Sequence, residues 1–295
     1  MCISRSASGN VPTVILSRDR ARKQCRRSMK RLCWQKSMQR KRRREREVIS
    51  VFFGGGTPSA VDAGMLARVM EKLRSKYVFS EDAEITLEAN PGTLDAEKLK
   101  CYRKSGFNRI SIGCQSVHDE ELKRLGRIHT FAEFQESFVL ARDAGFANIN
   151  VDLMSGLPEQ SEEKWEESLR TIAELSPEHI SAYSLIVEPG TPFAEQKLDL
   201  PDEDTERENV MPERRKILAE YGFFQYEISN YAKPGFACRH NIGYWKKDGL
   251  SGVRAFRGIV IRKPPVDEHG RSIFVSESGA EHWKRSVRMR KFFPG

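Results

Sequence analysis

The sequence predicts an α/β protein built around a parallel sheet, and two observations carry that prediction. Between Val48 and Ile228, apolar strand-like runs alternate with amphipathic helical stretches, which is the pattern of repeated βα units. The chain has 295 residues and 39% hydrophobic content, which is enough to bury a substantial core. Six strands with five intervening helices suit a partial barrel, a full barrel or an open doubly wound sheet, and periodicity alone does not choose among them.

The expected strands and helices alternate along the chain. Strands are expected at residues 48–53, 84–88, 108–113, 148–153, 179–185 and 224–228. Helices are expected near residues 61–76, 95–104, 131–144, 161–175 and 205–221. Ser161 precedes one of these helices and Thr93 or Asp95 another, and such side chains suit the N-cap position.

The net charge of +9 is distributed unevenly along the chain. Residues 1–47 contain 16 basic and 3 acidic residues, and residues 248–295 contain 10 basic and 5 acidic residues. Residues 48–247 therefore contain 24 basic and 33 acidic residues, a net charge of −9. The basic ends keep no long apolar face, so we expect a solvated or disordered tail there, and no nucleic-acid partner.

The cysteines and the apolar runs bear on the compartment. The six cysteines, at positions 2, 25, 33, 101, 114 and 238, have no paired spacing and form no metal motif, so reduced thiols are expected. No run of eighteen apolar residues exists, and residues 1–10 lack the apolar stretch of a secretory signal. We therefore expect a cytoplasmic protein without a membrane span.

A glycine-rich loop follows the first expected strand. Residues 52–59 read Phe-Phe-Gly-Gly-Gly-Thr-Pro-Ser and lead into a helix. Without Cβ atoms, the glycines let the backbone approach a ligand closely. A ligand-contacting loop is the natural interpretation, and a flexible turn is the alternative, since such loops are common.

Polar residues also stand at the carboxyl ends of later strands. Glu88 precedes Asn90, Gln115 ends the run Ser-Ile-Gly-Cys-Gln, and Asp152 lies within Asn-Val-Asp-Leu. In parallel α/β folds, ligands bind at this edge of the sheet. One such residue is commonly an ordinary loop residue, but several at successive strands indicate a site.

Five segments together resemble a known family. They are Phe-Phe-Gly-Gly-Gly-Thr-Pro-Ser (52–59), Leu-Glu-Ala-Asn-Pro-Gly (87–92), Arg-Ile-Ser-Ile-Gly-Cys-Gln-Ser (109–116), Leu-Gly-Arg-Ile-His (125–129) and Asn-Val-Asp-Leu-Met-Ser-Gly-Leu-Pro (150–158). In this order they resemble the radical S-adenosylmethionine (radical SAM) family of oxygen-independent coproporphyrinogen III oxidases. The resemblance is closest to the HemW-type members, regarded as haem chaperones, and runs from about residue 48 to 246.

The resemblance implies a fold, cofactors and a set of site residues. The fold would be a partial (β/α)6 barrel, and the cofactors S-adenosylmethionine and a 4Fe–4S cluster. The glycine loop would receive the methionine amino group, Glu88 would face the ribose, and three further residues would line the pocket. The implied cofactor-binding residues are Gly54, Gly55, Gly56, Thr57, Glu88, Gln115, Arg127 and Asp152. The catalytic residues are left unassigned.

A second segment of the chain resembles the haem-handling part of the chaperone branch. Residues 240–245 read His-Asn-Ile-Gly-Tyr-Trp, which matches a His-Asn-x-x-Tyr-Trp motif. Imidazole is a reasonable axial ligand of haem, so His240 is a candidate haem contact. The alternative, on the sequence alone, is a structural histidine.

The cluster motif of the family is missing from the sequence. The first strand should end in Cys-x-x-x-Cys-x-x-Cys, and no such spacing occurs, so we predict no metal ligands and a barrel incomplete at its N-terminal strand. Codons shifted by one frame from residue 2 onward permit His-Ile-Pro-Phe-Cys-Val-Arg-Lys-Cys-Pro-Tyr-Cys-Asp-Phe. A shift in residues 249–255 permits Asp-Tyr-Leu-Gly-Phe-Gly. We therefore hypothesise that both ends are out-of-frame translations.

These observations divide the chain into four parts. Residues 1–47 are expected to be a disordered or out-of-frame basic segment, 48–230 the barrel core, 231–247 the start of the family's C-terminal region, and 248–295 an out-of-frame tail.

The expected function is that of a coproporphyrinogen oxidase-like protein of porphyrin metabolism, most simply a haem chaperone, inactive in radical chemistry as written. Its expected partners are haem or a porphyrin and haem-receiving proteins. The alternative is a non-catalytic binder of haem or S-adenosylmethionine.

Overall fold

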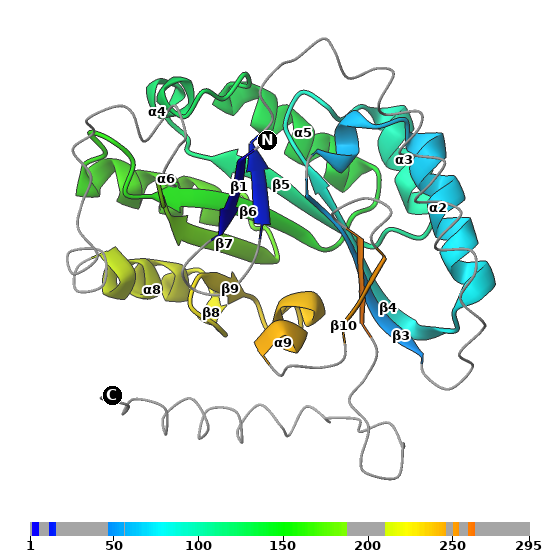
Figure 1. Cartoon of the computed structure of the whole chain (residues 1–295). Helices are drawn as coiled ribbons and strands as arrows, with labels where there is room; N and C mark the ends of the chain where they lie inside the picture. The colour runs from blue at the N-terminus through cyan, green and yellow to red at the C-terminus, as the bar shows by residue number, and fades with distance from the viewer. Residues whose placement is uncertain are drawn as a thin grey trace.

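A curled, mostly parallel sheet forms the centre of the molecule (Figure 1). The computed structural model describes residues 2–5, 12–15, 47–55, 57–187, 210–245, 250–253 and 259–262. Five neighbouring strands run parallel in chain order. They are β3 (Val48–Phe53), β4 (Phe79–Ala89), β5 (Arg109–Gln115), β6 (Ile149–Ser155) and β7 (His179–Ser184). The sequence predicted all five, although β4 begins five residues earlier than expected.

Helices connect these strands and cover the apolar face of the sheet (Figure 1). They are α2 (Ala63–Lys76), α3 (Ala96–Lys104), α4 (Asp119–Arg124), α5 (Phe131–Asp143), α6 (Glu162–Glu174) and α8 (Met211–Glu220), and a short 3-10 helix, η2, spans Pro58–Ala60. The sequence predicted α2, α3, α5, α6 and α8 but missed α4, whose six residues are too few to show a helical period.

Alternate residues of each parallel strand point into the core. Val51 on β3, Leu87 on β4, Ile112 on β5 and Val151 on β6 are fully buried among the helices. Since side chains alternate along a strand, the intervening residues face the other side of the sheet. That second side carries the polar residues described below.

The helices begin at the predicted kinds of cap. Asp95 accepts a hydrogen bond from the backbone of Lys98, and Ser161 accepts one from Lys164. A capping box, which the sequence analysis did not note, begins α5, because Thr130 and Glu133 bond each other's backbone. These caps fix where each helix leaves the edge of the sheet that carries the loops.

The prediction of a sixth parallel strand is wrong. Residues 224–228 were predicted to extend the parallel sheet, but β8 is limited to Phe224–Gln225 and lies at the sheet's edge. Between β7 and β8 lies β9 (Asn230–Ala232), which pairs antiparallel with both. A tight turn after Gln225 brings the chain back before a parallel strand can form. A short helix that was not predicted, α9 (Arg239–Trp245), follows β9.

Four short strands lie within the two ends of the chain. A separate antiparallel hairpin joins β1 (Cys2–Arg5) to β2 (Pro12–Ile15). On the free edge of β3, β11 (Ile259–Arg262) pairs antiparallel, and β10 (Leu250–Val253) pairs with β11. The place beside β3 where a further parallel strand would complete the barrel is therefore taken by an antiparallel one. Among the described residues, no helix is long and apolar enough to cross a membrane.

Candidate cofactor pocket

The side of the sheet opposite the core carries most of the predicted site residues. We call it the polar face. Parallel pairing sets Glu88 beside Ser111, Gly113 beside Asp152, and Asp152 beside Ser181. Its residues are Ser50, Phe52, Gly54, Glu84, Thr86, Glu88, Arg109, Ser111, Gly113, Asn150, Asp152, Met154, His179, Ser181 and Tyr183. The period of two therefore gathers residues from five strands on one surface.

The glycine loop lies against the carboxylate of Glu88. The backbone N–H of Gly55 donates to Oε2 of Glu88 at 3.0 Å. A Cβ atom at Gly54 would lie 2.7 Å from the carboxyl carbon of Glu88, so this position has no room for a side chain. Gly55 itself has a φ of 73°, a conformation that favours glycine. The structure therefore explains why Gly54 and Gly55 are glycines, and Gly56 lies outside the described residues.

Glu88 and Asp152 form a pair of carboxylates on the polar face. Burial raises the pKa of Glu88 to about 7, the charge of Asp152 adds to the rise, and the Gly55 N–H opposes it. Burial also raises the pKa of Asp152, against hydrogen bonds from Asn150, Ser181 and Ser111 and the charge of Arg109. Among the described residues, neither carboxylate forms a salt bridge with a basic side chain. Two such carboxylates favour a ligand that brings positive charge or hydroxyl donors.

Gln115 ends β5 in a backbone conformation unusual for its residue type. Its φ is 75°, and the pairing of β5 with β6 shifts register at this point. The hydroxyl of Tyr183 donates to Oε1 of Gln115 at 2.9 Å. A Cβ atom at Gly113 would lie 2.9 Å from the amide nitrogen of Gln115, so this glycine makes room for the side chain. The turned backbone directs Gln115 toward the polar face.

Thr57 and Arg127 complete the set of predicted pocket residues. The Oγ1 atom of Thr57 accepts a hydrogen bond from the Asn90 side chain at 3.0 Å, which ties the glycine loop to the end of β4. Burial raises the pKa of Tyr183, the Asp152 charge adds to the rise, and the Arg127 charge opposes it. Tyr183 therefore lies within electrostatic reach of both. The structure brings Gly54, Gly55, Thr57, Glu88, Gln115, Arg127 and Asp152 to one end of the sheet.

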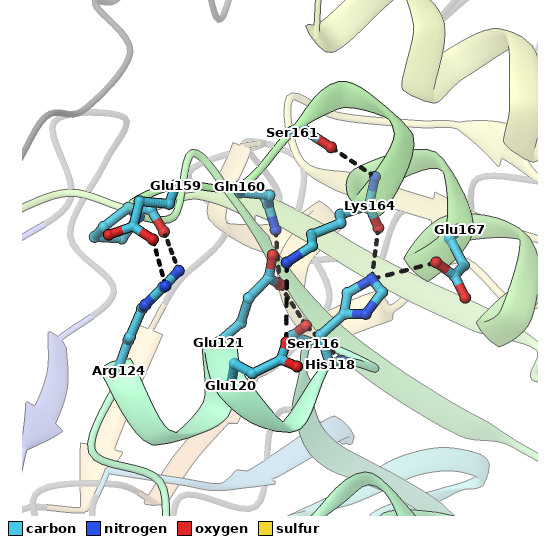
Figure 2. A network of polar contacts seen from close by, with 11 residues as sticks. Ser116, His118, Glu120, Glu121, Arg124, Glu159, Gln160, Ser161, Lys164 and Glu167 are labelled. Carbon is cyan, nitrogen blue, oxygen red and sulfur yellow. Dashed lines mark hydrogen bonds and ion pairs between the residues drawn. The ribbon is translucent and has the colours of Figure 1, made fainter.

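A buried polar network supports the loop that follows Gln115 (Figure 2). Glu121 on α4 is buried, and its Oε2 accepts hydrogen bonds from Ser116 and from Gln160, the latter at 3.1 Å. His118 lies 3.2 Å from the Lys164 carbonyl and 3.7 Å from the Glu167 carboxylate. The network joins the β5–α4 loop to the start of α6, so it fixes the segments that follow β5 and β6 relative to each other.

His240 lies apart from the carboxylate pair, beside Phe52 and Glu84 of the polar face. Its ring stacks on Phe52, with centroids 4.5 Å apart and planes inclined by 23°. Its backbone N–H donates to Oε1 of Glu84 at 3.2 Å, and the side chain is 5% exposed. Phe52 is two residues before Gly54 on β3, so α9 contacts the strand that leads into the glycine loop. In this arrangement, His240 packs in the interior.

Several residues of the site were not identified from the sequence. Tyr183, Glu84, Asn150 and His179 all belong to the polar face, yet none of them was predicted from the sequence. Their signal was the alternation of polar residues within strands, as at 84, 86 and 88 and at 179, 181 and 183. Tyr226 had no such signal, because it follows β8 in a turn.

The donor set fits one of the implied cofactors and not the other. The two buried carboxylates, which form no salt bridge among the described residues, and the glycine loop suit an ammonium or sulfonium ligand with ribose hydroxyls. For a cluster, the free thiols whose side chains the structure describes are Cys101, Cys114 and Cys238. Over this part of the chain, no group of three or more His, Cys, Asp or Glu side chains could hold a metal ion. The described residues therefore supply no cluster site.

The chain matches a family model and curated relatives. Residues 36–172 match the model of the Radical SAM superfamily. The heme chaperone HemW of Haemophilus influenzae is 45% identical over 202 residues, which are 68% of this chain and 52% of that protein. HemW of Escherichia coli is 43% identical over 208 residues, which are 70% of this chain and 55% of that protein. The chain spans about half the length of these relatives.

A solved structure has a similar fold. The coproporphyrinogen III oxidase HemN of Escherichia coli, described as a radical SAM enzyme, superposes with a TM-score of 0.64. The match covers 80% of this chain and 54% of that chain, at 24% identity. This likeness confirms the partial barrel among the three architectures that periodicity left open. The match to the family model begins at residue 36, inside the segment predicted to be out of frame.

Proposed function

Because this chain belongs to the HemN/HemW-like radical SAM family, we propose that its core binds S-adenosylmethionine and that the protein serves as a haem chaperone. The observation that carries the first part is the pair of carboxylates, Glu88 and Asp152, beside a glycine loop with no room for a side chain at Gly54. A cationic ligand with hydroxyl groups would compensate both carboxylates at once.

Different residues would contact different parts of the cofactor. Backbone groups of Gly54–Thr57 would receive the methionine amino group, and Glu88 and Asp152 would accept hydrogen bonds from the ligand. Gln115, held by Tyr183, and the Arg127 guanidinium would line the remaining side. Bound to an intact cluster, S-adenosylmethionine supplies radical chemistry by reductive cleavage. The described residues would bind and orient the cofactor, and among them no three side chains are grouped to hold that cluster.

Haem is proposed on the strength of the relatives named heme chaperone and of the segment at His240–Trp245. His240 would be the axial ligand. In the packed arrangement its ring lies on Phe52, so ligation requires the two rings to separate. The expected partners are haem or a porphyrin and the proteins that receive haem, and the expected location is the cytoplasm.

A non-catalytic binder is the second candidate, and the observation in its favour is that the sequence has no Cys-x-x-x-Cys-x-x-Cys spacing. Reading the encoding nucleotide sequence in three frames separates the two. A Cys-x-x-x-Cys-x-x-Cys segment upstream in another frame would identify this chain as a misread copy of a cluster protein. A single uninterrupted frame would refute the frameshift hypothesis and leave a binder.

Two titrations on the full chain test the binding itself. Calorimetry should detect S-adenosylmethionine binding that Asp152→Asn weakens by at least tenfold. Haem titration should give a shifted Soret band that His240→Ala removes. His118→Ala is the matched control, because His118 contacts a backbone carbonyl and Glu167 far from α9. Absence of binding by the wild-type chain, or an unchanged Soret band in His240→Ala, would refute the corresponding part of the proposal.

A further inference from the structure

A continuous line of hydrogen bonds connects the carboxylate pair to α9. It starts at Asp152, whose Oδ1 accepts from the Asn150 amide at 2.7 Å. The Oδ1 atom of Asn150 bonds Nδ1 of His179, and Nε2 of His179 lies 2.7 Å from the Tyr226 hydroxyl. That hydroxyl meets the side-chain amide of Asn241 at 3.3 Å. The line thus runs from the proposed cofactor pocket to the proposed haem segment.

Each bond in this line has a determined direction. The Asn150 side chain donates its NH2 group to Oδ1 of Asp152, so its oxygen faces His179. Nδ1 of His179 must then donate. Burial, assisted by the Arg109 charge, lowers the pKa of His179, so the ring is neutral and Nε2 accepts from Tyr226. The oxygen of Tyr226 is left to accept from Asn241.

The far end of the line holds the first turn of α9. The backbone N–H of Cys238 also donates to the Tyr226 oxygen, at 3.3 Å. Glu84 accepts from the backbone N–H groups of Arg239 and His240 at 3.1 and 3.2 Å. Tyr226 and Glu84 together therefore anchor residues 238–241. While both contacts hold, the His240 ring stays on Phe52.

We propose that His179 and Tyr226 are positioning residues that couple the two sites, so that S-adenosylmethionine bound at Asp152 weakens haem binding at His240. This inference rests on the proposed function. A ligand at Asp152 holds the carboxylate ionised, and an ionised acceptor strengthens the bond from Asn150. Polarisation along the line then strengthens the bonds of His179 and Tyr226. The anchored state of α9 gains stability, and haem ligation needs that state to open.

Reciprocity gives the inference a quantitative form. If the cofactor weakens haem binding by some factor, haem must weaken cofactor binding by the same factor. Couplings of this kind are typically about fivefold or more. The coupling requires that the two ligands favour different arrangements of α9. The cofactor favours the arrangement in which His240 stacks on Phe52, and haem favours the one in which the two rings are apart.

The test measures haem affinity of the full chain with and without saturating S-adenosylmethionine. The wild type should bind haem at least about fivefold more weakly with the cofactor present. Tyr226→Phe removes the hydroxyl that joins His179 to Asn241, and should reduce the factor to less than about twofold. Tyr221→Phe is the matched control, since its hydroxyl is exposed and contacts Glu174, and it should keep the wild-type factor.

A second measurement does not depend on haem. Hydrogen exchange over residues 238–245 should slow when the cofactor is added to the wild type and stay unchanged in Tyr226→Phe. Asn241→Ala, which leaves the His179–Tyr226 bond intact, should also lose the haem coupling and provides a check should Tyr226→Phe fold poorly.

The outcomes separate this inference from the proposed function. A wild type that binds both ligands without coupling, or with haem bound more tightly, overturns the inference and leaves the function standing. Coupling that persists in both Tyr226→Phe and Asn241→Ala also overturns it. A wild type that binds neither ligand overturns the proposed function and the inference together.

Discussion

The raised pKa of Glu88 predicts that cofactor binding depends on pH near neutrality. A cationic ligand prefers the ionised carboxylate, and with a pKa of about 7 the ionised fraction rises from about 0.1 at pH 6 to about 0.9 at pH 8. The affinity for S-adenosylmethionine should therefore rise by nearly tenfold over this interval, with release of a proton below pH 7. Glu88→Gln cannot ionise, so its affinity should be lower and should stay nearly constant from pH 6 to 8.

Calorimetry in buffers of different ionisation enthalpy measures both the affinity and the proton release. Asp152→Asn is an informative comparison, because removing its charge should lower the pKa of Glu88 and move the rise in affinity to lower pH. A pH-independent wild-type affinity, or a rise that persists in Glu88→Gln, would refute the assignment of the ionising group. Another acid within reach of the ligand would then be the ionising group.

The same shift predicts the stability of the ligand-free protein. The pKa of Glu88 is higher in the folded state, about 7 against an ordinary 4.5, so its contribution is fully present below pH 4.5 and is lost as pH rises through 7. The difference corresponds to about 3 kcal/mol at most. Urea unfolding at pH 5 and pH 8 should therefore show that Glu88→Gln loses less stability over this interval than the wild type does. An equal loss in both proteins would contradict the shift.

Three further predictions concern the loop, the core and α9. Gly54→Ala should displace the Glu88 carboxylate and weaken cofactor binding at least tenfold by calorimetry, whereas Gly64→Ala in α2 should not. Phe107→Ala should cost about 3–5 kcal/mol in urea unfolding because Phe107 is fully buried against Phe53, whereas exposed Phe224→Ala should cost little. Glu84→Gln should lower the free energy of unfolding by about 1–3 kcal/mol and speed hydrogen exchange at residues 239–240, because the NH2 group of the new side chain would face a backbone N–H donor. Unchanged exchange would contradict the anchoring role of Glu84.

The parallel core could be predicted because its signals are local. Each strand from β3 to β7 carries apolar residues at alternate positions, and each longer helix keeps a helical period or begins at a cap such as Ser161. The antiparallel insertion of β9 between β7 and β8 has no local signal, because it depends on which distant backbone finds a free edge. The short helices α4 and α9 were missed for want of a full period.

The pocket residues that have a local signal could be predicted, and those that depend on contacts between distant segments could not. Residues at strand ends, such as Glu88 and Gln115, are visible as polar residues after apolar runs. A residue that holds Gln115, Tyr183 near the end of β7, alternates with buried residues of its strand and becomes a neighbour only through register. The line from Asn150 to Tyr226 spans three segments of the chain, so its members meet only in the folded protein.

The register of β4, β5 and β6 bears on whether the pocket depends on the ends of the chain. A slip of one residue would turn Glu88 and Asp152 into the apolar core and bring Leu87 and Val151 to the polar face. Burying both carboxylates among the helices would cost several kcal/mol for each charge, so the observed register is strongly favoured. Within the part of the chain that the structure describes, these three strands pair only with one another and with β3 and β7. The carboxylate pair should therefore form whatever occupies the free edge of β3, and cofactor binding can be measured independently of the origin of the two ends.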